Sequence, residues 1–184
     1  YWRLGEYRNA ETAYLNYIAK YGSRGMQEGA IRNLVDVYRV LGENQKALTW
    51  LDRTLAKRIS TAMRQVLLFT KAKVLYTEER YAAALVIFQQ LGRSRLRSAA
   101  GGATAEEVQY FQALCLSKTG NKAGAEAIWR RLARDEFSYY GQRSAEKLGR
   151  KPSLDREACS AEQGPASKSI EADLVNLRRP LRRE

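Results

Sequence analysis

Cationic and aromatic side chains alternate at helical spacing in this sequence, and such pairs can bind sugar rings or acidic peptides. Aromatic faces stack on sugar rings, and lysine and arginine pair with carboxylates. If these segments form helices that line one groove, we expect it to be faced by the following side chains: Arg32, Asp36, Arg39, Phe69, Lys73, Tyr76, Tyr110 and Lys118. The alternative is that Phe69 and Tyr110 are buried between helices, because helix phase read from sequence errs by a residue or two.

Side chains that carry out catalysis are largely missing. The chain has no histidine, which is the usual general base, triad member and metal ligand. Its two cysteines are Cys115, in an apolar stretch, and Cys159, in a polar one, so neither a zinc site nor a disulfide is indicated. We therefore expect no catalytic residue, no cofactor and no metal. The redox state of the cysteines and the compartment stay open.

The charge balance favours an anionic partner. The chain has 32 lysines and arginines against 20 aspartates and glutamates, a net charge of +12. A basic surface speeds the encounter with polyanions such as acidic peptides, envelope polymers and nucleic acid. Nucleic acid is not favoured, because no nucleic-acid-binding motif accompanies the arginines. The alternative is that these arginines only line the solvated faces of helices.

One short segment concentrates both positive charge and flexible residue types. Arg93, Arg95 and Arg97 lie in a stretch rich in glycine and serine, which predicts a mobile basic loop. This basic loop could clasp an anionic partner. The alternative is that this segment is a surface insertion that the fold tolerates and that has no binding role.

A repeated sequence pattern predicts the helices that would position these side chains. Alanine recurs in the same local context at Ala10, Ala47, Ala84 and Ala125, at intervals of 37, 37 and 41 residues. A large residue follows each alanine by four positions, and another apolar residue follows by seven or eight, which is helical spacing. A small side chain at this point would let two helices approach closely. A fixed period of this size indicates a helical repeat array.

The segments between the alanines predict the other helix of each pair. The first helices are expected over residues 30–41, 66–75, 108–116 and 139–149, and the last of these lacks an obvious partner. Thr104, followed three residues later by Glu107, matches a helix capping box. Two antiparallel helices cannot bury both faces alone, so such pairs stack on one another. We expect an all-α superhelical array of antiparallel helix pairs, about four repeats, over residues 1–149.

The two ends of the chain read differently from the repeats. Residues 150–184 are predicted to be a linker and one short helix, over 169–179, that ends at Pro180. Because the chain begins at Tyr1 without methionine, we expect it to be a fragment or a processed product. No apolar run reaches the roughly 18 residues that a membrane span needs.

The repeat frame resembles the tetratricopeptide repeat, whose signature is glycine, then tyrosine, then alanine, followed by an aromatic residue. Gly5, Tyr7, Ala10 and Tyr14 carry this signature. The period here exceeds the family's usual one of about 34 residues, and Glu79 stands where glycine is expected. Some tetratricopeptide proteins clamp the terminal carboxylate of a peptide through an asparagine. This chain has Asp36 there, so that activity is not expected.

The flanks resemble the superhelical N-terminal domain of bacterial soluble lytic transglycosylases. The resemblance rests on the motifs Tyr1-Trp2-x-x-Gly5, Ile128-Trp129-x-x-Leu132-Ala133, Ser138-Tyr139-Tyr140-Gly141 and Leu148-Gly149. It implies a periplasmic or cell-envelope parent enzyme that cleaves peptidoglycan glycan strands, with this chain as a non-catalytic arm. The family's catalytic Glu-Ser dipeptide does not occur in the chain. The alternative is that these aromatics are ordinary core residues of a helical array.

Two classes of function stay open at this point. The first, slightly favoured, is the arm of a lytic transglycosylase that contacts peptidoglycan glycan strands or partner proteins. The second is a tetratricopeptide-type adaptor that gathers protein or peptide partners and has no connection to peptidoglycan. Polyanion binding is a weaker third option, which predicts that affinity falls steeply with salt.

Overall fold

The computed structural model describes residues 1–21, 28–96 and 103–150, and every regular element in these ranges is a helix. A short 3₁₀ helix, η1 (Trp2–Leu4), precedes the α-helices. Their bounds are α1 (Tyr7–Tyr21), α2 (Glu28–Val40), α3 (Asn44–Leu55), α4 (Thr61–Thr77), α5 (Tyr81–Gly92), α6 (Ala105–Lys118), α7 (Lys122–Leu132) and α8 (Tyr139–Lys147). The prediction of an all-α chain is confirmed for these ranges. None of the described helices is long and apolar enough to cross a membrane.

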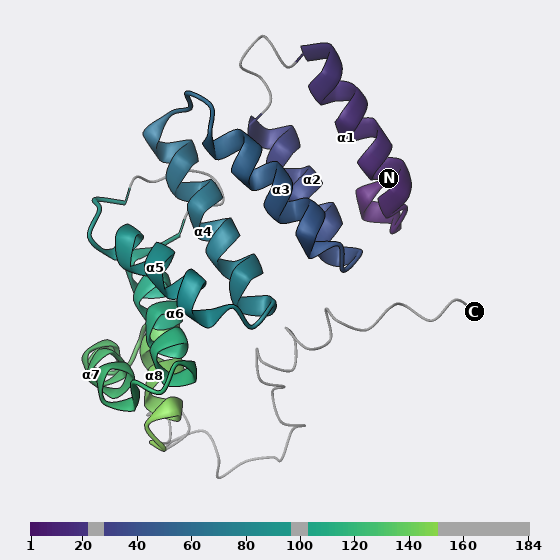
Figure 1. Cartoon of the computed structure of the whole chain (residues 1–184). Coiled ribbons are helices and arrows are strands. Elements are labelled where there is room, and N and C mark those ends of the chain that lie inside the picture. The colour runs from purple at the N-terminus through teal and green to yellow at the C-terminus, as the bar shows by residue number, and fades with distance from the viewer. Residues whose placement is uncertain (22–27, 97–102, 151–184) are drawn as a thin grey trace, which may run out of the picture.

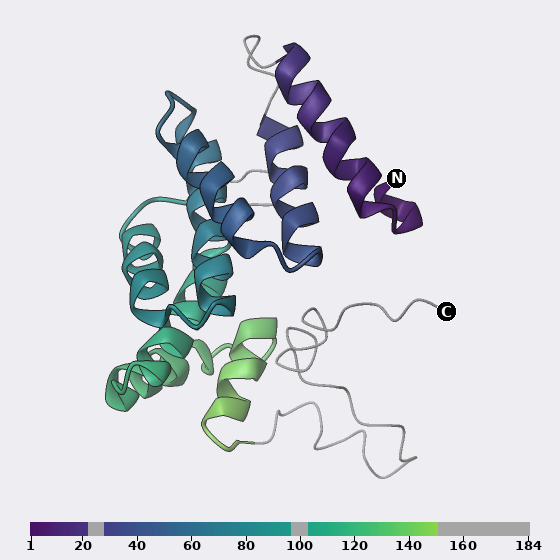
Figure 2. The ribbon, with the colours of Figure 1, turned by 45° about the vertical axis from the view of Figure 1, so that its right-hand side comes forward.

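Each α-helix packs against the next one along the chain, from α1 to α8. The succession follows a curved path, with α1 at one end and α7 and α8 at the other (Figures 1 and 2). Helices two apart also touch, because α2 contacts α4 and α6 contacts α8. α4 and α6 also meet, through the ring contact between Phe69 and Phe111, so each even-numbered helix touches the next even-numbered one.

The same turn closes η1 and each even-numbered helix from α2 to α8. One residue at each turn has a left-handed backbone, at Gly5 (φ 74°), Gly42 (φ 73°), Glu79 (φ 60°), Gly120 (φ 89°) and Gly149 (φ 73°). The following N–H donates to a carbonyl five residues earlier, as from Glu43 to Tyr38 (2.8 Å) and from Arg80 to Leu75 (2.9 Å). This hydrogen bond satisfies a carbonyl that the helix end leaves free. Glu79 adopts the glycine conformation despite its side chain.

The four repeated alanines occupy one structural position. Ala47, Ala84 and Ala125 are fully buried, and Ala10 is 3% exposed. Each lies five residues after a left-handed residue, near the start of α1, α3, α5 or α7. Their burial agrees with the expectation that a small side chain at this point lets neighbouring helices pack closely.

Side-chain caps start four of the described helices, and one glycine makes a close contact. The Oγ atoms of Ser60, Thr104 and Ser138 accept hydrogen bonds from N–H groups in the first turns of α4, α6 and α8, and Oδ1 of Asn121 does the same for α7. The bond from the N–H of Glu107 to Thr104 (3.1 Å) confirms the predicted cap. At Gly141 in α8, a β-carbon would lie 1.8 Å from the carbonyl oxygen of Asp135. Only glycine allows this approach.

The core runs through the whole helical succession. Its largest fully buried side chains include Ile31, Leu34, Leu51, Leu67, Phe88 and Leu91. Phe69, Phe88 and Phe111 join α4, α5 and α6 through ring contacts at 5.5 to 6.2 Å between centroids. Residues 151–184 lie outside the described part of the chain, and with them Cys159 and the helix expected over 169–179.

Candidate functional site

A series of interacting polar side chains runs from α2 through α4 and α6 to α8. We call it the polar strip and define it as Asp36, Arg39, Lys73, Glu107 and Tyr140. These residues come from all four even-numbered helices. At its α2 end, the guanidinium of Arg39 pairs with the carboxylate of Asp36 at 2.9 Å. Both groups act electrostatically on Lys73, which lies on the next even-numbered helix.

Lys73 and Glu107 form the centre of the polar strip. The Nζ of Lys73 lies 3.8 Å from Oε1 of Glu107, with both side chains largely covered. The Lys73 ammonium also sits over the rings of Phe69 and Phe111, 5.0 Å and 5.8 Å from their centroids. Burial lowers the pKa of Lys73, and the Glu107 carboxylate partly offsets this effect. The pair is therefore half-buried, and its cation lies against two aromatic rings.

Tyr140 closes the strip on α8. Burial raises the pKa of its hydroxyl, and the negative charge of Glu107 and a hydrogen bond to it act in the same direction. The Tyr140 ring packs on Tyr110 with 5.5 Å between centroids. Glu107 thus links α4 to α8 through Lys73 on one side and Tyr140 on the other.

A pocket of about 320 Å³ opens beside the α2 end of the polar strip. It is lined by Trp2, Arg3, Tyr14, Asn33 and Asp36, and we call it the N-terminal pocket. Trp2 is 38% exposed, so part of its ring is available to a ligand. Two aromatic rings beside an amide and a carboxylate combine a stacking surface with directional hydrogen-bonding groups.

The predicted groove residues divide between the strip and the core. Asp36, Arg39 and Lys73 lie on the polar strip, whereas Phe69 is only 5% exposed and Tyr110 only 6%. Burial, the alternative left open for Phe69 and Tyr110, is therefore their state in this structure. The Phe69 and Tyr110 rings pack against Lys73 and Tyr140 of the polar strip and are too buried to stack on a ligand.

The remaining candidates lie near the strip or at its edges. Arg32 is half-buried on α2, and Tyr76 on α4 packs on Tyr81 and Phe111. Lys118 is exposed at the end of α6, where its ammonium lies 6.0 Å from the centroid of the Tyr81 ring. Lys118 is therefore the last residue of α6 and is not a neighbour of the Lys73–Glu107 pair.

The basic loop is only partly described. Arg93 and Arg95 are exposed after the end of α5, and Arg97 lies outside the described residues. The backbone carbonyl of Arg95 accepts a hydrogen bond from the Gln65 side chain of α4 (3.0 Å). The first part of this loop is thus held against α4.

Sequence reasoning missed Glu107, Phe111 and Tyr140 as parts of the site. The sequence indicates Glu107 only as part of a capping box, and Tyr140 only as part of the motif Ser138-Tyr139-Tyr140-Gly141. A signal was present for Glu107, because it falls one turn before the apolar Phe111 on the same helix face. Trp2 and Tyr14 of the N-terminal pocket come together only through the packing of η1 and α1 near α2.

The Cys115 thiol is not activated, and the described residues hold no cluster of metal ligands. Burial raises the pKa of the Cys115 thiol to about 12, which leaves it protonated at neutral pH. Within residues 1–21, 28–96 and 103–150, no three histidine, cysteine, aspartate or glutamate side chains gather as metal ligands. The polar strip and the N-terminal pocket are arrangements that can bind a ligand through charge, hydrogen bonds and ring stacking.

Comparisons of this chain with protein-family models, with curated proteins and with solved structures find no match.

Proposed function

We propose that this chain is a non-catalytic binding module that holds an extended ligand along the polar strip and in the N-terminal pocket. The observation that carries the proposal is the half-buried Lys73–Glu107 pair, whose side chains are 30% and 18% exposed, so that a ligand can still reach both charges. Apolar residues can often replace a buried ion pair with no loss of stability. We infer that the polar strip presents the pair to a ligand that needs both a cation and an anion.

We further propose that the module is a superhelical array of antiparallel helix pairs of the tetratricopeptide type. Its support is the repeated unit of a left-handed residue followed five residues later by a buried alanine. In such arrays the first helices of the pairs line the binding face. The first helices would be α2, α4, α6 and α8, which are the helices that carry the polar strip.

For the ligand, we propose peptidoglycan glycan strands, with the chain as the arm of a soluble lytic transglycosylase in the periplasm or cell envelope. The specific observation in favour is the N-terminal pocket, in which Trp2 and Tyr14 face the polar groups of Asn33 and Asp36. Sugar rings have an apolar face and hydroxyl groups, so this lining complements them. The alternative is a tetratricopeptide-type adaptor for protein or peptide partners, whose acidic groups would pair with Arg39 and Lys73.

The test is co-sedimentation of the protein with purified, insoluble peptidoglycan. The variants Trp2→Ala and Asp36→Asn should lower the bound fraction, because each removes a contact from the N-terminal pocket. Tyr17→Ala and Asp52→Asn are the matched controls. Tyr17 is 36% exposed on α1 without lining the pocket, and Asp52 is ion-paired with Lys71 on the α3–α4 side. Both controls should bind as the wild type does.

Two outcomes would contradict the proposed ligand. One is that the wild-type protein stays in the supernatant, and the other is that all four variants lose binding equally. Either result would leave the adaptor function as the better account of the polar strip.

A further inference from the structure

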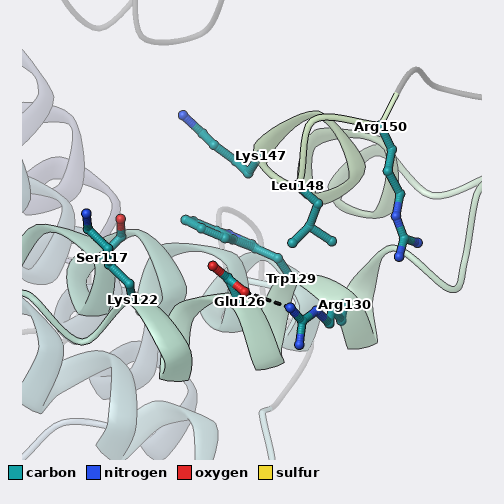
Figure 3. Close-up of a pocket in the computed structure, with 8 residues that line it drawn as sticks. All are labelled: Ser117, Lys122, Glu126, Trp129, Arg130, Lys147, Leu148 and Arg150. Atoms are coloured by element: carbon teal, nitrogen blue, oxygen red, sulfur yellow. Dashed lines mark hydrogen bonds and ion pairs between the residues drawn. The ribbon is translucent and has the colours of Figure 1, made fainter.

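A second pocket lies at the other end of the molecule, between the α6–α7 turn and the end of α8 (Figure 3). Its volume is about 360 Å³. We call it the C-terminal pocket, and its lining residues are Ser117, Lys122, Glu126, Trp129, Arg130, Lys147, Leu148 and Arg150. It shares no residue with the polar strip or with the N-terminal pocket.

The repeat frame explains why this pocket is open. Ser117 and Lys122 lie three residues before and two residues after the left-handed Gly120, and the matching residues around Glu79 are Tyr76 and Tyr81. In that preceding unit the two tyrosines pack on each other with 5.3 Å between ring centroids. The space that two aromatic rings fill in one unit is thus lined by a serine and a lysine in the next.

Positive charge dominates the lining of the C-terminal pocket. Its residues include four cations and one carboxylate, Glu126, which already pairs with Arg130 at 2.7 Å. Figure 3 shows the side chains of Lys147 and Arg150 on opposite sides of Leu148 and Trp129, with the Arg150 guanidinium turned toward α7 and the Lys147 amine turned away from it. Cations gathered from two different helix ends raise the local concentration of anions.

Trp129 provides an independent indication of a ligand. Its side chain lines the pocket and is 7% exposed, and its buried Nε1–H has no hydrogen-bond acceptor among the described residues. Leaving a buried donor unpaired is unfavourable, so such groups usually find an acceptor. An oxygen atom of a bound ligand would supply one.

We propose that the C-terminal pocket binds a dianionic phosphate group, either free phosphate or the phosphate of an ester with an apolar body. Lys122, Lys147 and Arg150 would balance the charge, and Trp129 would donate to a phosphate oxygen. Leu148 and the Trp129 ring would contact the apolar part of an ester. This site goes beyond the proposed binding function, and it does not depend on the polar strip.

The experiment titrates the ¹⁵N-labelled full chain with inorganic phosphate and, separately, with phenyl phosphate, at about 150 mM salt. The readout is the indole N–H signal of Trp129, assigned with the variant Trp129→Phe. Saturable shifts of this signal support the proposal. Equal affinity for both probes would indicate free phosphate, and roughly tenfold tighter binding of phenyl phosphate would indicate an ester.

Two sets of variants make the test specific. Lys147→Gln should weaken binding roughly tenfold, whereas Lys118→Gln, at the matching position before Gly120, should leave it unchanged. The double variant Ser117→Tyr with Lys122→Tyr copies the preceding unit, so it should abolish binding without lowering the melting temperature.

The proposal would be overturned if the Trp129 signal did not move with either probe. It would also be overturned if Lys118→Gln weakened binding as much as Lys147→Gln, because binding would then follow net charge alone. The variant Trp2→Ala should bind phosphate normally, so failure here and failure of the proposed glycan binding are distinguishable.

Discussion

Among single residues, Glu79 has a backbone conformation that is unfavourable for a residue with a side chain. It has φ 60° in a turn where the equivalent residues are glycines. A left-handed backbone costs a residue with a β-carbon about 1 to 2 kcal/mol. Replacing that residue with glycine removes this cost, but glycine has more freedom in the unfolded chain, which lowers stability by about 0.4 to 1 kcal/mol.

We therefore predict that Glu79→Gly is more stable than Glu79→Ala by about 0.5 to 1 kcal/mol. Both variants remove the carboxylate, so their difference reports the backbone alone. Urea unfolding of the two proteins measures it. Equal stabilities would mean that the turn carries no strain at Glu79.

The lowered pKa of Glu43 makes the free energy of unfolding depend on pH. A hydrogen bond from Arg8 (2.5 Å) and then one from Lys46 lower the pKa of Glu43 from 4.5 to about 2. The ionised carboxylate is therefore favoured in the folded state. Its contribution to stability is complete above pH 4.5, and it is lost as the pH falls toward 2.

The variant Glu43→Gln should unfold about 1 kcal/mol more easily than the wild type at pH 7, a small value because Arg8 is well exposed. The gap should narrow between pH 4.5 and pH 2, as followed by chemical denaturation at several pH values. A gap that stays constant over this range would show that the Arg8–Glu43 pair does not determine the titration.

At the scale of helices, the repeated alanines determine how closely neighbours pack. Ala84 is fully buried on α5, and Ala82 on the same helix is exposed. We predict that Ala84→Leu destabilises the fold by about 1 to 3 kcal/mol through overpacking. Ala82→Leu should change stability by no more than about 0.5 kcal/mol. Similar effects of both in thermal unfolding would contradict the close approach at Ala84.

Helix α8 depends on its glycine in the same way. Because a β-carbon at Gly141 would collide with the carbonyl of Asp135, Gly141→Ala should destabilise the protein by roughly 2 to 3 kcal/mol. The control is Gly29→Ala on α2, where a β-carbon meets nothing within 4 Å. It should stabilise by up to about 1 kcal/mol. Unfolding curves in guanidinium would reveal the opposite signs, and a shared sign would refute the argument.

At the scale of the whole molecule, the repeat frame was readable from sequence because it depends on local rules. A left-handed residue, a small residue and apolar residues at helical spacing define each helix start within about ten positions. The four alanines and the turn residues therefore predict the helices, and the predicted bounds lie within three residues of the structure except at the start of α4, expected at residue 66 and found at Thr61.

The site was less readable because it depends on how distant helices pack. Nothing in the local sequence of Phe69 indicates that Phe88 and Phe111 will cover its ring. Likewise Glu107 looks like a cap until α4 and α8 bring Lys73 and Tyr140 beside it. The two pockets are harder still to predict, since each is formed by side chains of consecutive helices that meet only after packing.

Chemical-shift mapping with soluble peptidoglycan glycan fragments would show whether a ligand occupies the N-terminal pocket and the polar strip. We predict that the largest shifts fall on the Trp2 indole N–H and the Asn33 side-chain amide, and extend along the strip to Lys73. Shifts confined to Arg93 and Arg95, or scattered over all basic residues, would contradict this occupancy and indicate non-specific attraction to the positive charge.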